Sequence, residues 1–326
     1  MKAIVYTKYG SPDVLQLMEV EKPAPKDDEV LVKVQAASVN ALDWHLLTAD
    51  IFLVRLMGMG LLKPKNQILG ADIAGRVEAV GKNVSRFRPG DEVCGDIGHG
   101  GFAEYALGTE KTLALKPANL SFEAAAAVPV AALTALQGVR DEGKIQAGQK
   151  VLINGAAGGV GTFAVQVAKA FGAEVTAVCS ARNMEQARKL GADQVIDYTQ
   201  ENFTQSGKQY DLIFAANGYH PLSAYKRALT PRGMYVMAGG KPAQIFEAML
   251  LGGWLSEKNG RKMGGVSAHI DQKDLLTLKE MLEAGKIVPA IDKRYPLGEA
   301  AEALRYLGEG HAKGKVVITV AVDSQA

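Results

Sequence analysis

The sequence predicts an α/β protein that combines a doubly wound parallel sheet with a second, strand-rich domain. Three observations support this fold class. Residues 150–180 have the pattern strand, glycine-rich turn, helix, strand, and a regular alternation of helices and strands continues to residue 268. Residues 1–120 contain short strands separated by proline and glycine breaks. We therefore expect domain boundaries near residues 120 and 268.

The N-terminal region is expected to form a compact, barrel-like domain. Its strands are predicted at residues 2–6, 29–37 and 75–80. Ser121 then has the pattern of a helix N-cap, with Glu123 in the first turn, and Pro129 interrupts that helix.

The glycine-rich turn has the context of a phosphate-binding fingerprint. The run 151–153 is typical of a buried parallel strand, and residues 155–161, Gly-Ala-Ala-Gly-Gly-Val-Gly, precede a helix predicted over 162–171. Glycines leave backbone N–H groups open to a pyrophosphate, and Gly161 allows the helix to pack against the strand. This pattern predicts a Rossmann dinucleotide-binding domain, with a plain structural turn as the alternative. The expected cofactor contacts in the turn are Ala157, Gly158, Gly159 and Val160.

The residues after the next strand, predicted over 174–179, indicate which dinucleotide binds. An NAD site usually has an acid there that accepts from the ribose 2′-hydroxyl. This chain has Ser180 and Arg182 instead, and its first acid is Glu185 in the following helix. A hydroxyl and a guanidinium suit a 2′-phosphate, and one charge-assisted hydrogen bond contributes about 1.5–3 kcal/mol. We predict NADPH, with a roughly ten- to hundred-fold preference; a solvated Arg182 is the alternative.

The rest of the chain continues the alternation and then changes character. Helices are predicted at 184–190 and 221–229, and strands at 194–196, 211–215, 233–238 and 262–267, the last as an edge strand. The remaining elements do not form another αβ unit of the sheet. They are two helices, predicted at 271–284 and 298–307, and a strand predicted at 315–320. We expect residues 269–326 to return to the first domain.

Composition and charge exclude several functions. The chain has 326 residues, of which 48% are hydrophobic and 22% charged, as in ordinary globular proteins of about two domains. Its 37 basic and 35 acidic residues give a formal charge of +2, too balanced to suggest a nucleic-acid partner. The apolar tract 124–139 is too short to span a bilayer, so no membrane partner is expected. Because only Cys94 and Cys179 are present and no signal peptide is evident, we expect a reducing, cytoplasmic setting, with a Cys94–Cys179 disulfide as the alternative.

Several segments together resemble the medium-chain dehydrogenase/reductase superfamily, in its zinc-independent quinone oxidoreductase (zeta-crystallin-like) branch. These segments are residues 37–43, 69–75, 89–93, 101–105 and 190–192. Residues 63–70 and 310–318 are similar to NADPH-dependent quinone and alkenal/enone reductases. The resemblance implies a GroES-like catalytic domain over 1–120 and 269–326 and an NADPH-binding Rossmann domain over 121–268. It also implies a homodimer, in which strand 262–267 pairs across a two-fold axis.

The chain departs from the zinc branch of that superfamily. Asn40 stands where the zinc enzymes have a first-ligand Cys, and Gly70-Ala71-Asp72 stands where they have Gly-His-Glu. Catalytic zinc needs about three protein ligands, and Asn40 with Ala71 cannot supply two of them. No metal is expected.

The resemblance also implies roles for individual residues. Asn40 and Thr134 match positions near the nicotinamide half of the cofactor and are the expected catalytic residues; a turn-stabilising Asn and a helix-bonding Thr are the alternatives. Tyr198 matches a position beside the adenosine phosphate, with a half-buried aromatic as the alternative. Asn217 ends a strand at the carboxyl edge of the sheet, where α/β ligands bind. Asp43 is expected to order the Asn40 loop.

Other residues are candidates for the substrate side. Trp44 and His45 follow this loop and could face the substrate; His45 is a candidate proton donor, although a lone histidine is more often packed or solvated. The apolar segments 51–62 and 245–254 could wall a hydrophobic pocket, or serve as core, flap or subunit interface.

We therefore predict an NADPH-dependent reductase that transfers hydride to a quinone or to an α,β-unsaturated carbonyl. One alternative is an NADPH-binding sensor or structural protein without catalysis. Another is an enoyl-thioester reductase, which requires a basic patch for its carrier; Arg55, Lys63 and Lys65 are the candidates for that patch.

Overall fold

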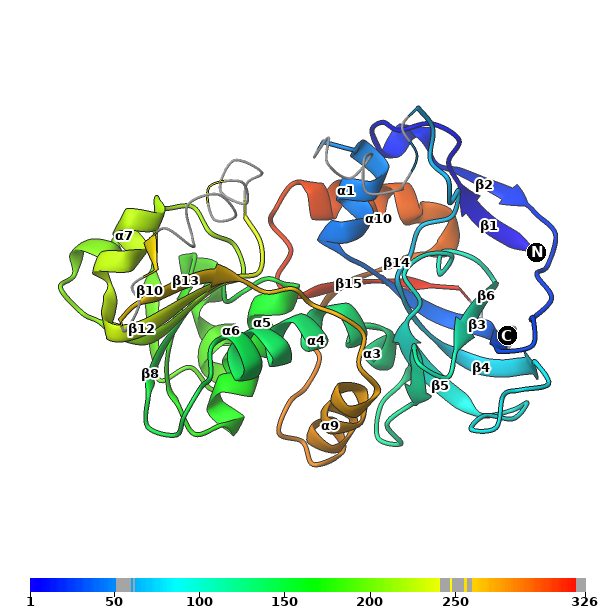
Figure 1. Ribbon diagram of the computed structural model, residues 1–326. Coiled ribbons are helices and arrows are strands. Elements are labelled where there is room, and N and C mark those ends of the chain that lie inside the picture. Colours follow the sequence, from blue (N-terminus) through cyan, green and yellow to red (C-terminus); the bar gives the residue numbers. More distant parts are fainter. Residues whose placement is uncertain (51–59, 61, 241–246, 248–254, 257–259, 321–326) are drawn as a thin grey trace. The chain divides into compact units, whose positions relative to one another are not determined.

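The computed structural model describes residues 1–50, 60, 62–240, 247, 255–256 and 260–320 (Figure 1). Most of the two apolar segments expected to wall a pocket, 51–62 and 245–254, lies outside these residues. No helix within the described ranges is long and apolar enough to cross a membrane.

The described chain divides into two compact units. Unit 1 contains Met1–Val130, Ile270–Glu283 and the chain from Pro289 onward, and unit 2 contains Ala131–His269 and Ala284–Val288. The division follows residue 130 and not the boundary predicted near residue 120. The reason is that helix α3 (Phe122–Ala126) packs against the strands of unit 1. Ser121 caps this helix as predicted, because its hydroxyl accepts from the Ala124 amide at 3.2 Å.

Unit 2 is built on a six-stranded parallel sheet, which confirms the predicted doubly wound α/β class. The strand order is β10-β9-β8-β11-β12-β13, and every neighbouring pair is parallel. The strands are β8 (Lys150–Asn154), β9 (Glu174–Cys179), β10 (Gln194–Asp197), β11 (Tyr210–Ala215), β12 (Leu229–Met237) and β13 (Lys262–Gly265). Its helical elements include α4 (Pro129–Gln137), which begins at the end of unit 1, η3 (Gly138–Glu142), α5 (Gly159–Ala170), η4 (Ala181–Asn183), α6 (Met184–Lys189), η5 (Phe203–Gln205) and α7 (Leu222–Arg227).

Helix α5 begins earlier than the sequence pattern predicts. Its first residue is Gly159 and its N-cap is Gly158, although the prediction placed its start at Thr162. Glycines weaken helices in general, but tertiary contacts hold this turn: Phe163 and Val167 are fully buried. The helix therefore brings its first amides next to the end of β8.

Unit 1 is strand-rich, as predicted. Its large sheet has the order β14-β15-β3-β4-β5-β7, and β6 also pairs with β3. These strands are β3 (Glu29–Val39), β4 (Asp72–Val80), β5 (Glu92–Asp96), β6 (Tyr105–Thr109), β7 (Leu113–Leu115), β14 (Ile291–Pro296) and β15 (Lys315–Thr319). A separate hairpin joins β1 (Lys2–Val5) and β2 (Gln16–Glu19). The helical elements among the described residues of unit 1 are η1 (Pro12–Val14), α1 (Ala41–Thr48), α3, α9 (Gln272–Glu283), η6 (Leu297–Glu299) and α10 (Ala300–Gly308).

Strand β15 joins the C-terminal part of the chain to the N-terminal part. It pairs antiparallel with β3, with Val316 opposite Val39 and Ile318 opposite Ala37, and on its other side it pairs with β14. All four of these residues are nearly or fully buried. The core of unit 1 therefore requires residues that are far apart in the sequence.

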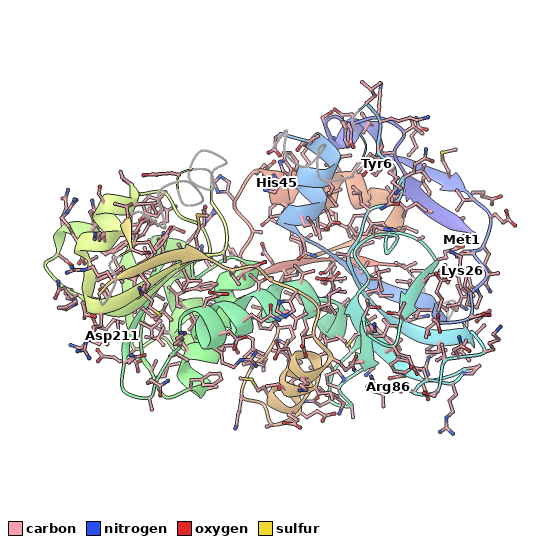
Figure 2. All side chains as sticks on the ribbon, in the orientation of Figure 1. Met1, Tyr6, Lys26, His45, Arg86 and Asp211 are labelled. Carbon is pink, nitrogen blue, oxygen red and sulfur yellow. The ribbon has the colours of Figure 1, made fainter. Side chains whose placement is uncertain are left out.

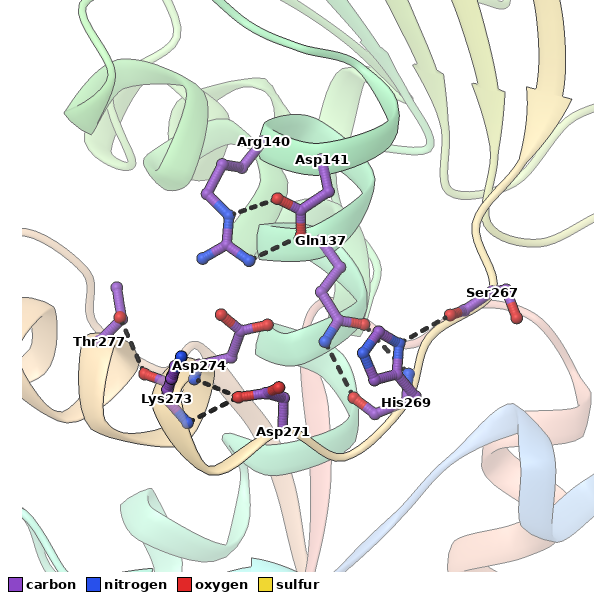
Figure 3. Close-up of polar contacts among 9 residues, drawn as sticks. All are labelled: Gln137, Arg140, Asp141, Ser267, His269, Asp271, Lys273, Asp274 and Thr277. Atoms are coloured by element: carbon purple, nitrogen blue, oxygen red, sulfur yellow. Dashed lines mark hydrogen bonds and ion pairs between the residues drawn. The ribbon is translucent and has the colours of Figure 1, made fainter.

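In unit 2, a side-chain amide fixes the segment that follows β13. Gln137 on α4 is buried, and its Nε2 donates to the His269 carbonyl at 2.9 Å while its Oε1 accepts from the His269 amide at 3.0 Å (Figure 3). One glutamine thus satisfies both backbone groups of His269, which would otherwise need other partners.

Candidate functional site

The glycine-rich turn after β8 depends on two glycines for its backbone path. Gly155 has φ of +84°, and a Cβ there would lie 2.8 Å from the Asn217 Cβ. A Cβ on Gly161 would lie 2.0 Å from the Gly155 carbonyl oxygen. Neither position can carry a side chain, so the turn closes tightly and brings the loop after β11 beside it.

Gly158 is different, because the fold itself does not require glycine there. Its φ is −78°, and a Cβ would meet only the Gly155 carbonyl oxygen, at 3.8 Å. No side chain caps the first amides of α5 from this position. The space in front of the helix start is therefore of the kind that the pyrophosphate of a dinucleotide fills.

The end of β9 presents a hydroxyl and a guanidinium. Ser180 is half-buried and Arg182 on η4 is exposed. The first acid after β9, Glu185, is exposed and pairs with Lys189 at 2.7 Å, which lowers the pKa of Glu185. Asp197, which sequence reasoning missed, lies opposite Cys179 in the register of β10 and β9, and its Oδ1 accepts from the amide and hydroxyl of Thr199.

Aromatic residues line the ends of β10 and β11. Tyr198 is 51% exposed, and its ring centroid lies 6.0 Å from that of exposed Tyr219. The Tyr225 hydroxyl accepts from the Tyr219 amide at 3.1 Å and from the Asn154 side chain at 2.9 Å. The Asn154 side chain also donates to the carbonyl of Asn217, which is exposed. Asn154 was not predicted as a site residue; a polar residue that closes an otherwise apolar strand was the available signal.

In unit 1, Asn40 belongs to a buried ionic network. Its Nδ2 donates to Asp72 Oδ2 at 2.9 Å, and Lys315 Nζ donates to its Oδ1. Asp72 is fully buried and Lys315 is 2% exposed, and the two form an ion pair at 3.4 Å. Asp72 also accepts from the Ser38 hydroxyl at 2.8 Å and from the Val130 amide at 2.9 Å. No spacing in the sequence indicates that Lys315 reaches Asn40, because the two residues are brought together only when β15 pairs with β3, which ends just before Asn40.

Two further carboxyl groups lie in unit 1 close to this network. Asp43 accepts from the Asn40 amide at 2.8 Å and from the Gly70 amide at 2.9 Å, so it orders the loop as expected. Burial raises the pKa of Asp43 to about 6, although these two bonds lower it. Asp96 pairs with Asp72 in the register of β5 and β4, and burial together with the negative charge of Asp72 raises the pKa of Asp96.

The remaining predicted residues occupy varied positions. Thr134 is buried on α4 in unit 2, so it and Asn40 belong to different units. Trp44 packs against α10 within unit 1. Gly308 of α10 lies so close to the Trp44 ring that a Cβ on this glycine would be 2.3 Å from a ring carbon. His45 lies on α1 (Figure 2) and is half-buried. Its Nδ1 lies 2.8 Å from Asp50 Oδ1.

No group of three or more His, Cys, Asp or Glu among the described residues is arranged to hold a metal ion. Asn40 offers an amide that is already bonded to Asp72 and Lys315, and Ala71 offers a methyl group. Neither side chain is a usual zinc ligand.

Comparisons with known proteins agree with this architecture. The family model of the alcohol dehydrogenase GroES-like domain matches residues 26–118, and that of zinc-binding dehydrogenase matches residues 190–318. A chloroplast envelope quinone oxidoreductase homolog of Arabidopsis thaliana is 34% identical over 98% of this chain and 98% of its own length. An NADPH-dependent alkenal/one oxidoreductase of the same plant is 35% identical, covering 98% and 79%. The solved quinone oxidoreductase from Coxiella burnetii has a TM-score of 0.88 and 30% identity, and the match covers 98% of this chain and 99% of that one.

The chain therefore belongs to the medium-chain dehydrogenase/reductase superfamily, an NAD(P)H-dependent oxidoreductase family. Within it, the chain is a member of the quinone oxidoreductase branch, as the sequence motifs indicated.

The expectation of a cytoplasmic protein is wrong. Relatives of this chain are named as chloroplast envelope, chloroplastic and mitochondrial proteins. A low cysteine content indicates only a reducing setting, and it does not distinguish the cytoplasm from the interior of an organelle.

Proposed function

We propose that this protein is a zinc-independent reductase that uses NADPH to reduce quinones or α,β-unsaturated carbonyls. The observation that carries the cofactor choice is the end of β9, where Ser180 and Arg182 stand and the nearest acid in the sequence, Glu185, is paired with Lys189. A guanidinium and a hydroxyl stabilise a 2′-phosphate, whereas an NAD site uses a carboxylate. A relative of this chain is named an NADPH-dependent alkenal/one oxidoreductase, which supports the same choice.

We assign the cofactor contacts to the carboxyl edge of the sheet in unit 2. Ala157 to Val160 would hold the pyrophosphate with backbone amides at the start of α5. Ser180 and Arg182 would bind the 2′-phosphate, Tyr198 would lie beside the adenosine, and Asn217 would complete the site after β11. When bound, the nicotinamide supplies a hydride, and the acceptor also takes up one proton.

We also propose catalytic roles for Asn40 and Thr134. Lys315 holds the oxygen of the Asn40 amide and Asp72 takes one of its two N–H groups, so the orientation of the amide is fixed. The second N–H is the donor that Asn40 offers to cofactor or substrate. As hydride arrives at a conjugated carbon, negative charge develops on the carbonyl oxygen, and hydrogen-bond donors stabilise that charge.

Replacement of Arg182 by alanine tests the cofactor choice. We expect the Kd for NADPH to rise about ten- to hundred-fold and that for NADH to stay nearly constant, because only the 2′-phosphate pairs with the guanidinium. Arg227, exposed on α7, is a matched control, and Arg227→Ala should change neither constant. Equal effects of Arg182→Ala on both cofactors would contradict the assignment.

The substrate class requires a turnover assay. Stopped-flow loss of NADPH absorbance should be measured with a panel of quinones, alkenals and enoyl thioesters. Turnover with quinones or alkenals supports the proposal. Tight NADPH binding without turnover of any of them would instead indicate a cofactor-binding sensor, and turnover of thioesters alone would indicate an enoyl reductase.

We further propose that the protein is a homodimer. Strand β13 is the last strand of the six-stranded sheet, and no strand among the described residues pairs with its outer edge, which we assign to a second copy of the chain. Light scattering coupled to size exclusion should give twice the mass of 34.6 kDa.

A further inference from the structure

A buried asparagine stands directly behind the hydroxyl at the end of β9. Asn183 is 6% exposed, closes η4 and precedes α6. Its Nδ2 donates to Ser180 Oγ at 3.1 Å, and its backbone amide donates to the Ser180 carbonyl at 2.9 Å. Its Oδ1 is buried, and it accepts no hydrogen bond from the part of the chain that the structure describes. The side chain therefore makes one polar contact described here, and that contact is to Ser180.

The direction of this hydrogen bond determines what Ser180 can do. A serine hydroxyl has one proton to donate and two lone pairs that accept. Because Asn183 donates, it occupies a lone pair of Ser180 and leaves the hydroxyl proton for another partner. Ser180 is only half-buried, so that partner can come from outside the protein. An ionised phosphate oxygen, which only accepts, suits such a donor.

We propose that Asn183 is a positioning residue that sets the Ser180 hydroxyl as a donor and thereby selects an adenosine bearing a 2′-phosphate. This inference rests on the proposed use of NADPH and adds a determinant of it that does not touch the cofactor.

The charges around Ser180 are compatible with this role. Arg182 follows in the same short helix and adds a cation. The nearby acids have other partners: Glu185 pairs with Lys189, and Asp197 Oδ1 accepts from Thr199. A 2′-phosphate would therefore meet a hydroxyl proton and a guanidinium at this strand end.

The decisive variant is Asn183→Asp, which keeps the shape of the side chain and reverses the hydrogen bond. An ionised aspartate can only accept, so the Ser180 proton turns toward it and Ser180 presents lone pairs outward. Isothermal titration of the full chain with adenosine 2′,5′-bisphosphate and with adenosine 5′-monophosphate measures the preference without any turnover. We expect the ratio of the two affinities to fall about tenfold or more.

The new carboxylate could also repel the phosphate directly. Repeating the substitution in a Ser180→Ala background separates this repulsion from an effect transmitted through the Ser180 hydroxyl. If the hydroxyl transmits the effect, Asn183→Asp lowers the ratio clearly less in that background than in the wild type. An equal loss in both backgrounds would overturn the proposal. Asn202→Asp is a matched control, because Asn202 already accepts from Thr204 through Oδ1, and it should leave the ratio unchanged.

A second variant covers the case in which Asn183→Asp does not fold. Asn183→Ala removes the donor without adding charge, and it should lower the ratio by a smaller factor, about threefold. An unchanged ratio in Asn183→Ala would then overturn the proposal. Failure of the underlying function looks different, because a wild type that binds neither NADPH nor the bisphosphate refutes the NADPH assignment itself.

Discussion

Replacement of Lys315 by methionine tests the buried network of unit 1. Methionine keeps most of the volume of the side chain but removes the ammonium that faces fully buried Asp72 and the Asn40 oxygen. Breaking a buried ion pair from one side costs about 3–5 kcal/mol, because it leaves an uncompensated charge. Asp72 keeps three donors, from Ser38, Asn40 and Val130, so we expect a loss near the lower limit, about 3 kcal/mol.

Urea unfolding followed by circular dichroism at pH 7.5 measures this loss. Lys189→Met is the matched control, because Lys189 pairs with Glu185 in solvent and its loss should have no measurable effect. A loss below about 1 kcal/mol for Lys315→Met would refute the reasoning.

Three other substitutions give separable results. Gly161→Ala should destabilise unit 2 and abolish cofactor binding, because the alanine Cβ would lie 2.0 Å from the Gly155 carbonyl oxygen. Thermal unfolding measures the loss of stability. Gly158→Ala should leave the melting temperature nearly unchanged but weaken NADPH binding at least about tenfold in titrations, because the methyl group enters the space assigned to the pyrophosphate; unchanged binding would count against that assignment. Asp96→Asn should stabilise the protein by about 1–2 kcal/mol at pH 8 and by little at pH 4.5. The pKa of Asp96 is higher in the folded protein than in the unfolded chain, so the ionised carboxylate destabilises the fold as the pH rises above the unfolded-state pKa. An equal gain in stability for Asp96→Asn at both pH values would contradict this.

The sequence predicted the parallel sheet well because its signals are local. Short apolar runs in the sequence predict the strands and helices of unit 2, and the spacing of the glycines predicts the turn after β8. The start of α5 was placed late, because a helix that begins on glycine has no propensity signal and is held by the burial of Phe163 and Val167.

Local sequence patterns did not predict most of the polar networks. The contact of Lys315 with Asn40 and Asp72 depends on the pairing of β15 with β3 and β4 with β3, and no spacing in the sequence reports those pairings. Asn183 follows Ser180 and Arg182 in the sequence, but its hydrogen bond to Ser180 and the direction of that bond are visible only in the folded turn.

The placement of β15 has a consequence for synthesis on the ribosome. Asp72 and Asn40 are translated long before Lys315, and β3 lacks its neighbour β15 until residues 315–319 have been made. Until Lys315 has been made, burial of the Asp72 carboxylate lacks the ammonium that compensates its charge, so this part of the fold is less stable. The strands β8 to β13 of the six-stranded sheet follow one another in the sequence, so this sheet can form before β15 is made. A stop codon shortly before residue 315 would release a chain in which β3 has no β15 to pair with.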